Sequence, residues 1–269
     1  MTHHPLSLQS YQSEAQRTDR TRKTRGQEFL LLGLFGEVGT LMDEVKKKQR
    51  DTQSYVGYEN SVIEELGDVL WYLSNLANRA KLGLGAIAKY AMGEGPAPLA
   101  GQDVSLNFSQ IQSQQHLPFN EPTPAFERTL MQLVSAIGDL AKSESSRALD
   151  APALGVGLSH VFSRLVQAAN EAGVTLEQAA KKNLEKIVDR WPTDMRPKPH
   201  ALFDEKCEIE ERLPRQMKID IYERIITHRK QNEKHYVLQR SNGILIGDRV
   251  TDNILEPDDY RFHDVFHYA

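Results

Sequence analysis

Two carboxylates one helical turn apart are the first sign of a metal site in this chain. Glu65 and Asp68 lie within residues 62–71, at the edge of an apolar stripe with the period of a helix. Glu37 borders a similar stripe in an earlier segment, and Glu44 follows it two turns later. An unpaired carboxylate inside a helical bundle is costly, and a bound cation offsets that cost. Mg²⁺ prefers oxygen ligands, so these four acids are candidate ligands. The alternative is that they are solvated charges on exposed helix faces.

Helices are expected to position these acids. The periodicity of apolar residues predicts helices over residues 26–50, 61–81 and 84–92, with a turn-rich connection at 51–60. Ser61 and Glu64 have the spacing of a capping box at a helix start. We therefore assign Glu64 to the start of the second helix and leave Glu65 for the metal.

At these residues the chain resembles the MazG-like, all-α nucleoside triphosphate pyrophosphohydrolases. Their pattern is Glu-x-x-Glu on one helix and Glu-x-x-Asp on a later one; residues 33–47 are similar to the first half and residues 64–73 to the second. The chain departs from this pattern at Thr40, where the family usually places a ligand Glu. A hydroxyl is a poor substitute, so either Glu44 supplies the missing oxygen or the metal has one ligand fewer.

The resemblance implies hydrolysis of a ribo- or deoxyribonucleoside triphosphate to the monophosphate and pyrophosphate. Mg²⁺ is the expected ion, with Mn²⁺ as an alternative, held by Glu37, Glu65 and Asp68; Glu44 is a further ligand or a general base. Phosphoryl transfer depends mainly on positioning and charge neutralisation, which such a site provides. Two rival hypotheses are a catalytically weak or inactive nucleotide sensor and a purely structural helical scaffold.

Composition narrows the class of protein. The chain has 269 residues, of which 39% are hydrophobic and 26% charged, as in ordinary globular proteins. A net charge of −4 gives no general attraction to nucleic acid, so we expect no nucleic-acid partner. The apolar stretches fall short of the roughly 20 residues that span a bilayer, and no signal peptide is recognisable. Cys207 is the single cysteine, which fits a cytoplasmic protein without a membrane partner.

The apolar pattern of the first two helices returns later in the chain. Residues 130–140 align with 31–41 at an offset of 99, and residues 158–176 align with 66–84 at an offset of 92. Because glycine, asparagine and alanine identities also match, we predict an internal duplication. The alternative is that any two amphipathic helices share apolar spacing. The second copy lacks the three acids, because Ala136, Gly157 and His160 align with Glu37, Glu65 and Asp68. Asp139 aligns with Thr40.

A basic helical face follows in the second copy. Asn183, Lys186 and Arg190 recur at helical spacing and are similar to the phosphate-contacting helix of the family. Lys and Arg suit a polyphosphate, although a basic helix end also complements the helix dipole. Because one-repeat members of the family usually pair into dimers, we expect an intrachain pseudo-dimer with acids from repeat one and cations from repeat two. The candidate substrate-binding residues are Lys48, Asn78, Asn183, Lys186 and Arg190.

The predicted fold is mainly α, a MazG-like bundle of two tandem repeats followed by a small α+β appendage. The expected parts are a lead-in (1–25), repeat one (26–95), a linker (96–120), degenerate repeat two (121–195) and the appendage (196–269). The lead-in is either a helix or an unstructured segment. A homodimer or larger oligomer is left open.

The appendage resembles the C-terminal extension of some longer MazG-like proteins. Residues 201–226 suggest one or two short helices, and the Asn242-Gly243 turn predicts a β-hairpin. His263 and His267 have a spacing that a metal bridges, but structural histidines are the favoured interpretation. The chain ends at Ala269 within an expected helix without a capping signal, so we expect it to be shortened there or completed by a partner.

Overall fold

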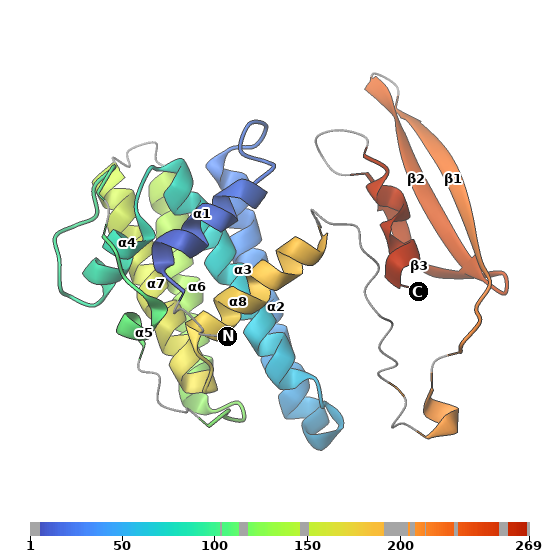
Figure 1. The fold of residues 1–269 in the computed structure, drawn as a ribbon, viewed down its shortest axis with the longest axis horizontal. Helices are drawn as coiled ribbons and strands as arrows, with labels where there is room; N and C mark the ends of the chain where they lie inside the picture. Colours follow the sequence, from blue (N-terminus) through green and yellow to red (C-terminus); the bar gives the residue numbers. More distant parts are fainter. Residues whose placement is uncertain are drawn as a thin grey trace. The chain divides into compact units, whose positions relative to one another are not determined.

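The computed structural model divides the chain into two compact units, Met1–Thr193 and Asp194–Ala269. Helices α1–α8 belong to the first unit and strands β1–β3 to the second (Figure 1). The structure describes residues 6–102, 104–112, 118–145, 151–190, 204, 208–212, 214–228, 231–252 and 258–267. Cys207 and the last two residues, including Ala269, lie outside these ranges.

Unit 1 is helical throughout its described elements, which confirms the mainly α prediction. Its elements are α1 (Leu8–Thr18), α2 (Gln27–Asp51), the short 3₁₀ helix η1 (Thr52–Ser54), α3 (Tyr58–Arg79), α4 (Leu84–Ala91), α5 (Phe108–Ile111), α6 (Pro124–Ser145), α7 (Ala151–Ala172) and α8 (Leu176–Arg190). No helix in the described part of the chain is long and apolar enough to cross a membrane.

The start of α3 differs from the prediction. The helix begins at Tyr58, and the backbone N–H of Ser61 already donates to the carbonyl of Gly57 at 3.1 Å. Ser61 is therefore inside the helix, and its hydroxyl lies 2.8 Å from the hydroxyl of Tyr55. The predicted capping box is wrong, because the helix extends one turn further back than the cap pattern indicated. Glu64 is consequently available for another partner.

The expected lead-in and linker both contain packed helices. Tyr11 in α1 and Phe108 in α5 are fully or almost fully buried, and their rings meet edge to face with centroids 6.0 Å apart. The chain just before each helix pairs with the other in an antiparallel bridge between Ser7 and Asn107. These two helices therefore join the hydrophobic core of unit 1.

Two glutamines make matching contacts in the two halves of unit 1. The side-chain amide of Gln12 donates to the carbonyl of Leu82 at 2.8 Å and accepts from the backbone N–H of Leu84 at 2.7 Å. The side-chain amide of Gln112 makes the same two bonds. It donates to the carbonyl of Val174 at 2.9 Å and accepts from the backbone N–H of Leu176 at 2.7 Å, and these partners lie 92 positions after Leu82 and Leu84. This equals the offset found in the sequence and supports the predicted duplication.

The first half of unit 1 contains α2, α3 and α4, and the second half contains α6, α7 and α8. The last helix of each half packs against the other half. Helix α2 packs on α3 and α6 packs on α7, whereas α8 packs on α3 and α4 packs on α7. The shared core contains fully buried leucines such as Leu34 on α2 and Leu66 on α3, each of which contributes about 2 kcal/mol by leaving water. The exchange brings a helix of the second half against the helix that carries Glu65 and Asp68, as α3 and α8 show in Figure 1.

Unit 2 contains a three-stranded antiparallel sheet in the order β1-β2-β3. Its elements are the 3₁₀ helix η2 (Ile209–Glu211), the strands β1 (Ile219–His228), β2 (Gln231–Ser241) and β3 (Ile244–Thr251), and the 3₁₀ helix η3 (Tyr260–His267). The predicted hairpin turn is confirmed, with positive φ angles of 51° at Asn242 and 79° at Gly243.

Strand β1 corrects the expectation of helices over residues 201–226. Only η2 is helical among the described residues there, and the chain is extended from Ile219 onward. Ile219, Ile221 and Ile225 alternate with polar positions on one face of this strand. This two-residue period was the signal for a strand, and the broken pattern near Pro214 obscured it.

Candidate active site

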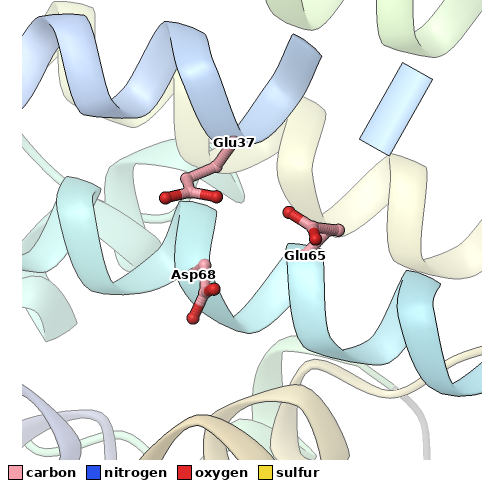
Figure 2. Close-up of side chains that lie close together, drawn as sticks. All are labelled: Glu37, Glu65 and Asp68. Atoms are coloured by element: carbon pink, nitrogen blue, oxygen red, sulfur yellow. The ribbon is translucent and has the colours of Figure 1, made fainter. Parts of the chain in front are cut away.

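Three acidic side chains from two packed helices converge in unit 1. Glu37 extends from α2, and Glu65 and Asp68 extend from successive turns of α3 (Figure 2). One carboxylate oxygen from each lies within 4.8 Å of the others. In the described residues this is the only group of three or more acidic, histidine or cysteine side chains that is placed to hold a metal ion. The arrangement therefore offers three oxygen ligands of the type that hard divalent cations prefer.

Glu65 carries the electrostatic cost of this convergence. Burial, followed by the nearby charges of Glu37 and Asp68 and a hydrogen bond with Glu37, raises the pKa of Glu65 to about 8, although Lys186 opposes the shift. Its Oε2 atom is buried and has no hydrogen-bond partner in the described structure. A positive charge next to Glu65 would stabilise its ionised form and give its unpartnered oxygen a partner. The donor set therefore fits a divalent cation.

Two polar side chains of α8 contact the carboxylate of Asp68. The side-chain amide of Asn183 donates to Asp68 Oδ1 at 2.7 Å, and Lys186 Nζ donates to Asp68 Oδ2 at 2.6 Å. Lys186 also contacts Glu64 Oε1 at 2.5 Å. Burial lowers the pKa of Lys186, but these two hydrogen bonds outweigh it and raise the pKa overall. The second half of unit 1 thus adds a cation next to the acids of the first half.

Glycine at position 67 allows this approach of α8 to α3. A Cβ atom there would lie 2.5 Å from the carbonyl oxygen of Ala179 and 2.9 Å from Cβ of Asn183. Both distances are too short for real contacts, and one involves backbone. Any side chain at this position would push α8 away from Asp68.

Tyr11 is a site residue that the sequence did not indicate. Its hydroxyl donates to Asn183 Oδ1 at 2.9 Å, while the amide nitrogen of Asn183 faces Asp68. Tyr11 is fully buried, and burial together with the charge of Asp68 raises its pKa well above the ordinary value. The protonated hydroxyl therefore fixes the orientation of the Asn183 amide. The only signal in the sequence was an aromatic residue within a polar segment.

Glu44 does not join the three acids. It lies about 10 Å further along the axis of α2 than Glu37, because each residue adds about 1.5 Å. Its carboxylate accepts hydrogen bonds from Lys47 at 2.6 Å and from the hydroxyl of Tyr55. Burial raises its pKa, but these bonds outweigh burial and lower the pKa overall. Its charge is thus satisfied by protein groups, and the structure does not support its role as a ligand or base.

Thr40 also supplies no ligand. Its side chain is exposed, and its hydroxyl donates to the carbonyl of Gly36 at 3.2 Å within the same helix. Of the two alternatives for this position, the structure favours a metal with one ligand fewer, since Glu44 lies outside the acidic group and the Thr40 hydroxyl is bonded within its own helix.

Two predicted substrate-binding residues lie apart from the acids. Lys48 is nearly buried and contacts the carbonyls of Thr52 and Tyr55 and the carboxylate of Glu121. Its α-carbon lies about 16 Å along α2 from that of Glu37. Asn78 is placed about 15 Å along α3 from Asp68 and donates to the carbonyl of Gln12 at 3.1 Å. Both residues stabilise the helical core rather than face the acidic group.

The remaining predicted residues are placed only in part. Arg190 is the last residue of α8, but its side chain lies outside the described structure. In unit 2, His263 stacks on Tyr260 with ring centroids 4.0 Å apart, and its Nδ1 lies 2.9 Å from the Tyr260 carbonyl. The side chain of His267 also lies outside the described residues. The contacts of His263 are those of a structural histidine.

Two regions of the chain match models of known protein families. Residues 25–89 match the model of the MazG nucleotide pyrophosphohydrolase domain, and residues 198–269 match the model of the MazG C-terminal domain. The Gene 37 protein of Mycobacterium phage L5 is 36% identical over 66 residues, which are 24% of this chain and 58% of that protein. The chain therefore spans less than two thirds of that relative. No solved structure matches.

Proposed function

This chain belongs to the MazG-like family, and we propose that it is a Mg²⁺-dependent hydrolase that converts a nucleoside triphosphate to the monophosphate and pyrophosphate. The observation that carries this proposal is the convergence of Glu37, Glu65 and Asp68 within 4.8 Å, with an orphaned oxygen on Glu65. The first matched region covers all three acids.

The carboxylates are assigned to cation binding. A divalent cation at these oxygens would neutralise phosphate charge and lower the pKa of an attacking water. Mn²⁺ takes similar oxygen ligands and is expected to substitute for Mg²⁺. Glu65 must be ionised to serve as a ligand, so it gives up its proton when the site fills.

Lys186 is assigned to the phosphates, and Asn183 to the border of the site beside them. Lys186 Nζ is held between Asp68 and Glu64 at 2.6 and 2.5 Å, at the border of the acidic group. It is a compact positive charge on a flexible stem, suited to follow the pyrophosphate as it leaves. Asn183 accepts a hydrogen bond from Tyr11 and donates one to Asp68, so it orients this acid. It contacts Asp68 from α8, as Lys186 does. The site is thus composed of acids from one half and a cation from the other, with one site per chain.

Pyrophosphate release tests the proposal. The full chain is incubated with each common ribo- and deoxyribonucleoside triphosphate and Mg²⁺, and pyrophosphate is measured with a coupled assay. At least one substrate should yield one pyrophosphate per monophosphate, and Glu65→Gln should lower the rate by about 100-fold or more, as loss of a ligand does. The matched control is Glu59→Gln on the exposed first turn of α3, which should retain full activity.

The position of Thr40 favours a second candidate function, a nucleotide sensor with weak or no turnover. Its hydroxyl is used by its own helix, which leaves three carboxylates for the cation. In that case the chain would bind a triphosphate with Mg²⁺ and release no pyrophosphate. Measurable turnover that Glu65→Gln abolishes would exclude the sensor.

A further inference from the structure

A cavity of about 720 Å³ lies between α6 and α7 in the second half of unit 1. Its volume is within the range of pockets that hold small organic ligands. Its lining includes Ala136, Asp139, Gly157, His160 and Arg164.

The cavity occupies the position that corresponds to the acidic site. With the offset of 99 for α6 and 92 for α7, Ala136 corresponds to Glu37 and Gly157 to Glu65. Asp139 corresponds to Thr40, and His160 corresponds to Asp68. The removal of two long acidic side chains leaves open space where the first copy has its carboxylates.

The charges in this cavity are different from those of the acidic site. Among the described lining residues Asp139 is the one carboxylate, so these residues do not form the set of oxygen ligands that a hard divalent cation needs. Arg164 on α7 corresponds to Tyr72 on α3. In the first copy the ring of Tyr72 fills the space beside Gly33. In the described residues the Arg164 guanidinium donates to the side chain of Gln167 at 2.8 Å, which uses one of its five donors.

These lining groups match a particular class of ligand. A guanidinium binds phosphate oxygens in a fork and needs no metal to do so. His160 is exposed on α7 one turn before Arg164 and adds a second nitrogen donor on the same helix face. Asp139 has an exposed carboxylate 3.8 Å from the Lys142 ammonium, and a carboxylate has further acceptor sites that suit a sugar hydroxyl or a base amino group. A cation for the phosphate and an acceptor for the nucleoside lie in one cavity of sufficient size.

We propose that this cavity is a second, metal-independent binding site for a nucleoside diphosphate or monophosphate. The site is separate from the acidic centre, and the proposal goes beyond hydrolysis. The duplication has then yielded two sites of different chemistry: one that requires a divalent cation and one that uses Arg164 directly.

Isothermal titration in excess EDTA tests the proposal, because EDTA removes the divalent cation on which the acidic site depends. The full chain is titrated with the ribo and deoxy forms of the mono- and diphosphates of adenosine, guanosine, cytidine and uridine, and with inorganic phosphate. At least one nucleotide should bind at one site per chain with a Kd below about 1 mM. Inorganic phosphate should bind at least tenfold more weakly, since it lacks the nucleoside.

Two independent variants assign the binding to the cavity. Arg164→Gln removes the phosphate fork, and Ala136→Glu places a carboxylate where Glu37 stands in the first copy. Each should weaken nucleotide binding in EDTA at least tenfold, with thermal unfolding as the control for folding. Glu65→Gln should leave this binding unchanged.

Three results would overturn the proposal: no nucleotide binding in EDTA, binding that both cavity variants retain, or binding that Glu65→Gln abolishes. Pyrophosphate release is measured separately, so failure of this site is distinguishable from failure of the proposed hydrolysis.

Discussion

Binding of a divalent cation to the acidic centre should release a proton from Glu65. Burial and the charges of Glu37 and Asp68 raise the pKa of this residue to about 8, so near neutral pH the metal-free carboxyl is mostly protonated. A cation binds the ionised form, and therefore competes with the proton. Metal affinity must then depend on pH in a range where ordinary carboxylates are already ionised.

The size of this effect follows from the pKa. With a pKa near 8, the fraction of protonated Glu65 is about 0.9 at pH 7 and about 0.1 at pH 9, and these fractions give the protons released per ion. Below pH 8 the affinity should fall about tenfold per pH unit. Titration of Mn²⁺ in two buffers of different ionisation enthalpy measures the released protons directly.

The matched variants for this experiment lie on one helix. Glu65→Gln should abolish the proton release, whereas Glu59→Gln should behave as the unaltered chain. Proton release below about 0.2 per ion at pH 7 would refute the reasoning, because Glu65 would then be ionised without the cation.

Three further predictions concern the surroundings of the acids. Tyr11→Phe should lower kcat/KM about tenfold through misorientation of Asn183 and destabilise the fold by about 1–2 kcal/mol; kinetics and denaturant unfolding check both, and unchanged kinetics would contradict the positioning role. Gly67→Ala should cost about 1–3 kcal/mol and reduce activity, since the added methyl group meets the backbone of α8; an unaltered melting temperature would contradict the tight contact. Folding raises the pKa of Glu65 from its ordinary value of 4.5 to about 8. The protonated carboxyl therefore adds to the free energy of unfolding below pH 4.5, and this contribution is lost as the pH rises through 8. The melting temperature in EDTA should therefore fall over this range relative to that of Glu65→Gln, and parallel profiles would contradict the assignment.

Local spacing made Glu37, Glu65 and Asp68 candidate ligands, and the resemblance of residues 33–47 and 64–73 to the MazG-like pattern favoured a metal site over solvated charges. Glu65 and Asp68 share a helix face through the 3.6-residue period, and the apolar stripe beside Glu37 requires its helix to pack against another element, which the structure shows to be α3. The β-hairpin was predicted for the same reason, since the Asn242-Gly243 turn is encoded by adjacent residues.

Features that depend on distant contacts were not predictable. Tyr11 reaches Asn183 across 172 residues, and no local pattern indicates that its hydroxyl orients an amide. Glu64 has the spacing of a cap residue, but it contacts Lys186 because α3 starts earlier and α8 crosses it. In both cases tertiary packing by helix exchange decides the contact.

The arrangement of the acids around a cation is the central claim, and anomalous diffraction from crystals of the full chain soaked in Mn²⁺ tests it most directly. The expected result is an anomalous peak about 2.1 Å from one oxygen each of Glu37, Glu65 and Asp68, a distance typical of a hard cation with carboxylate ligands. The peak should be absent in Glu65→Gln crystals. A peak elsewhere, or no peak among these oxygens at saturating Mn²⁺, would contradict the account.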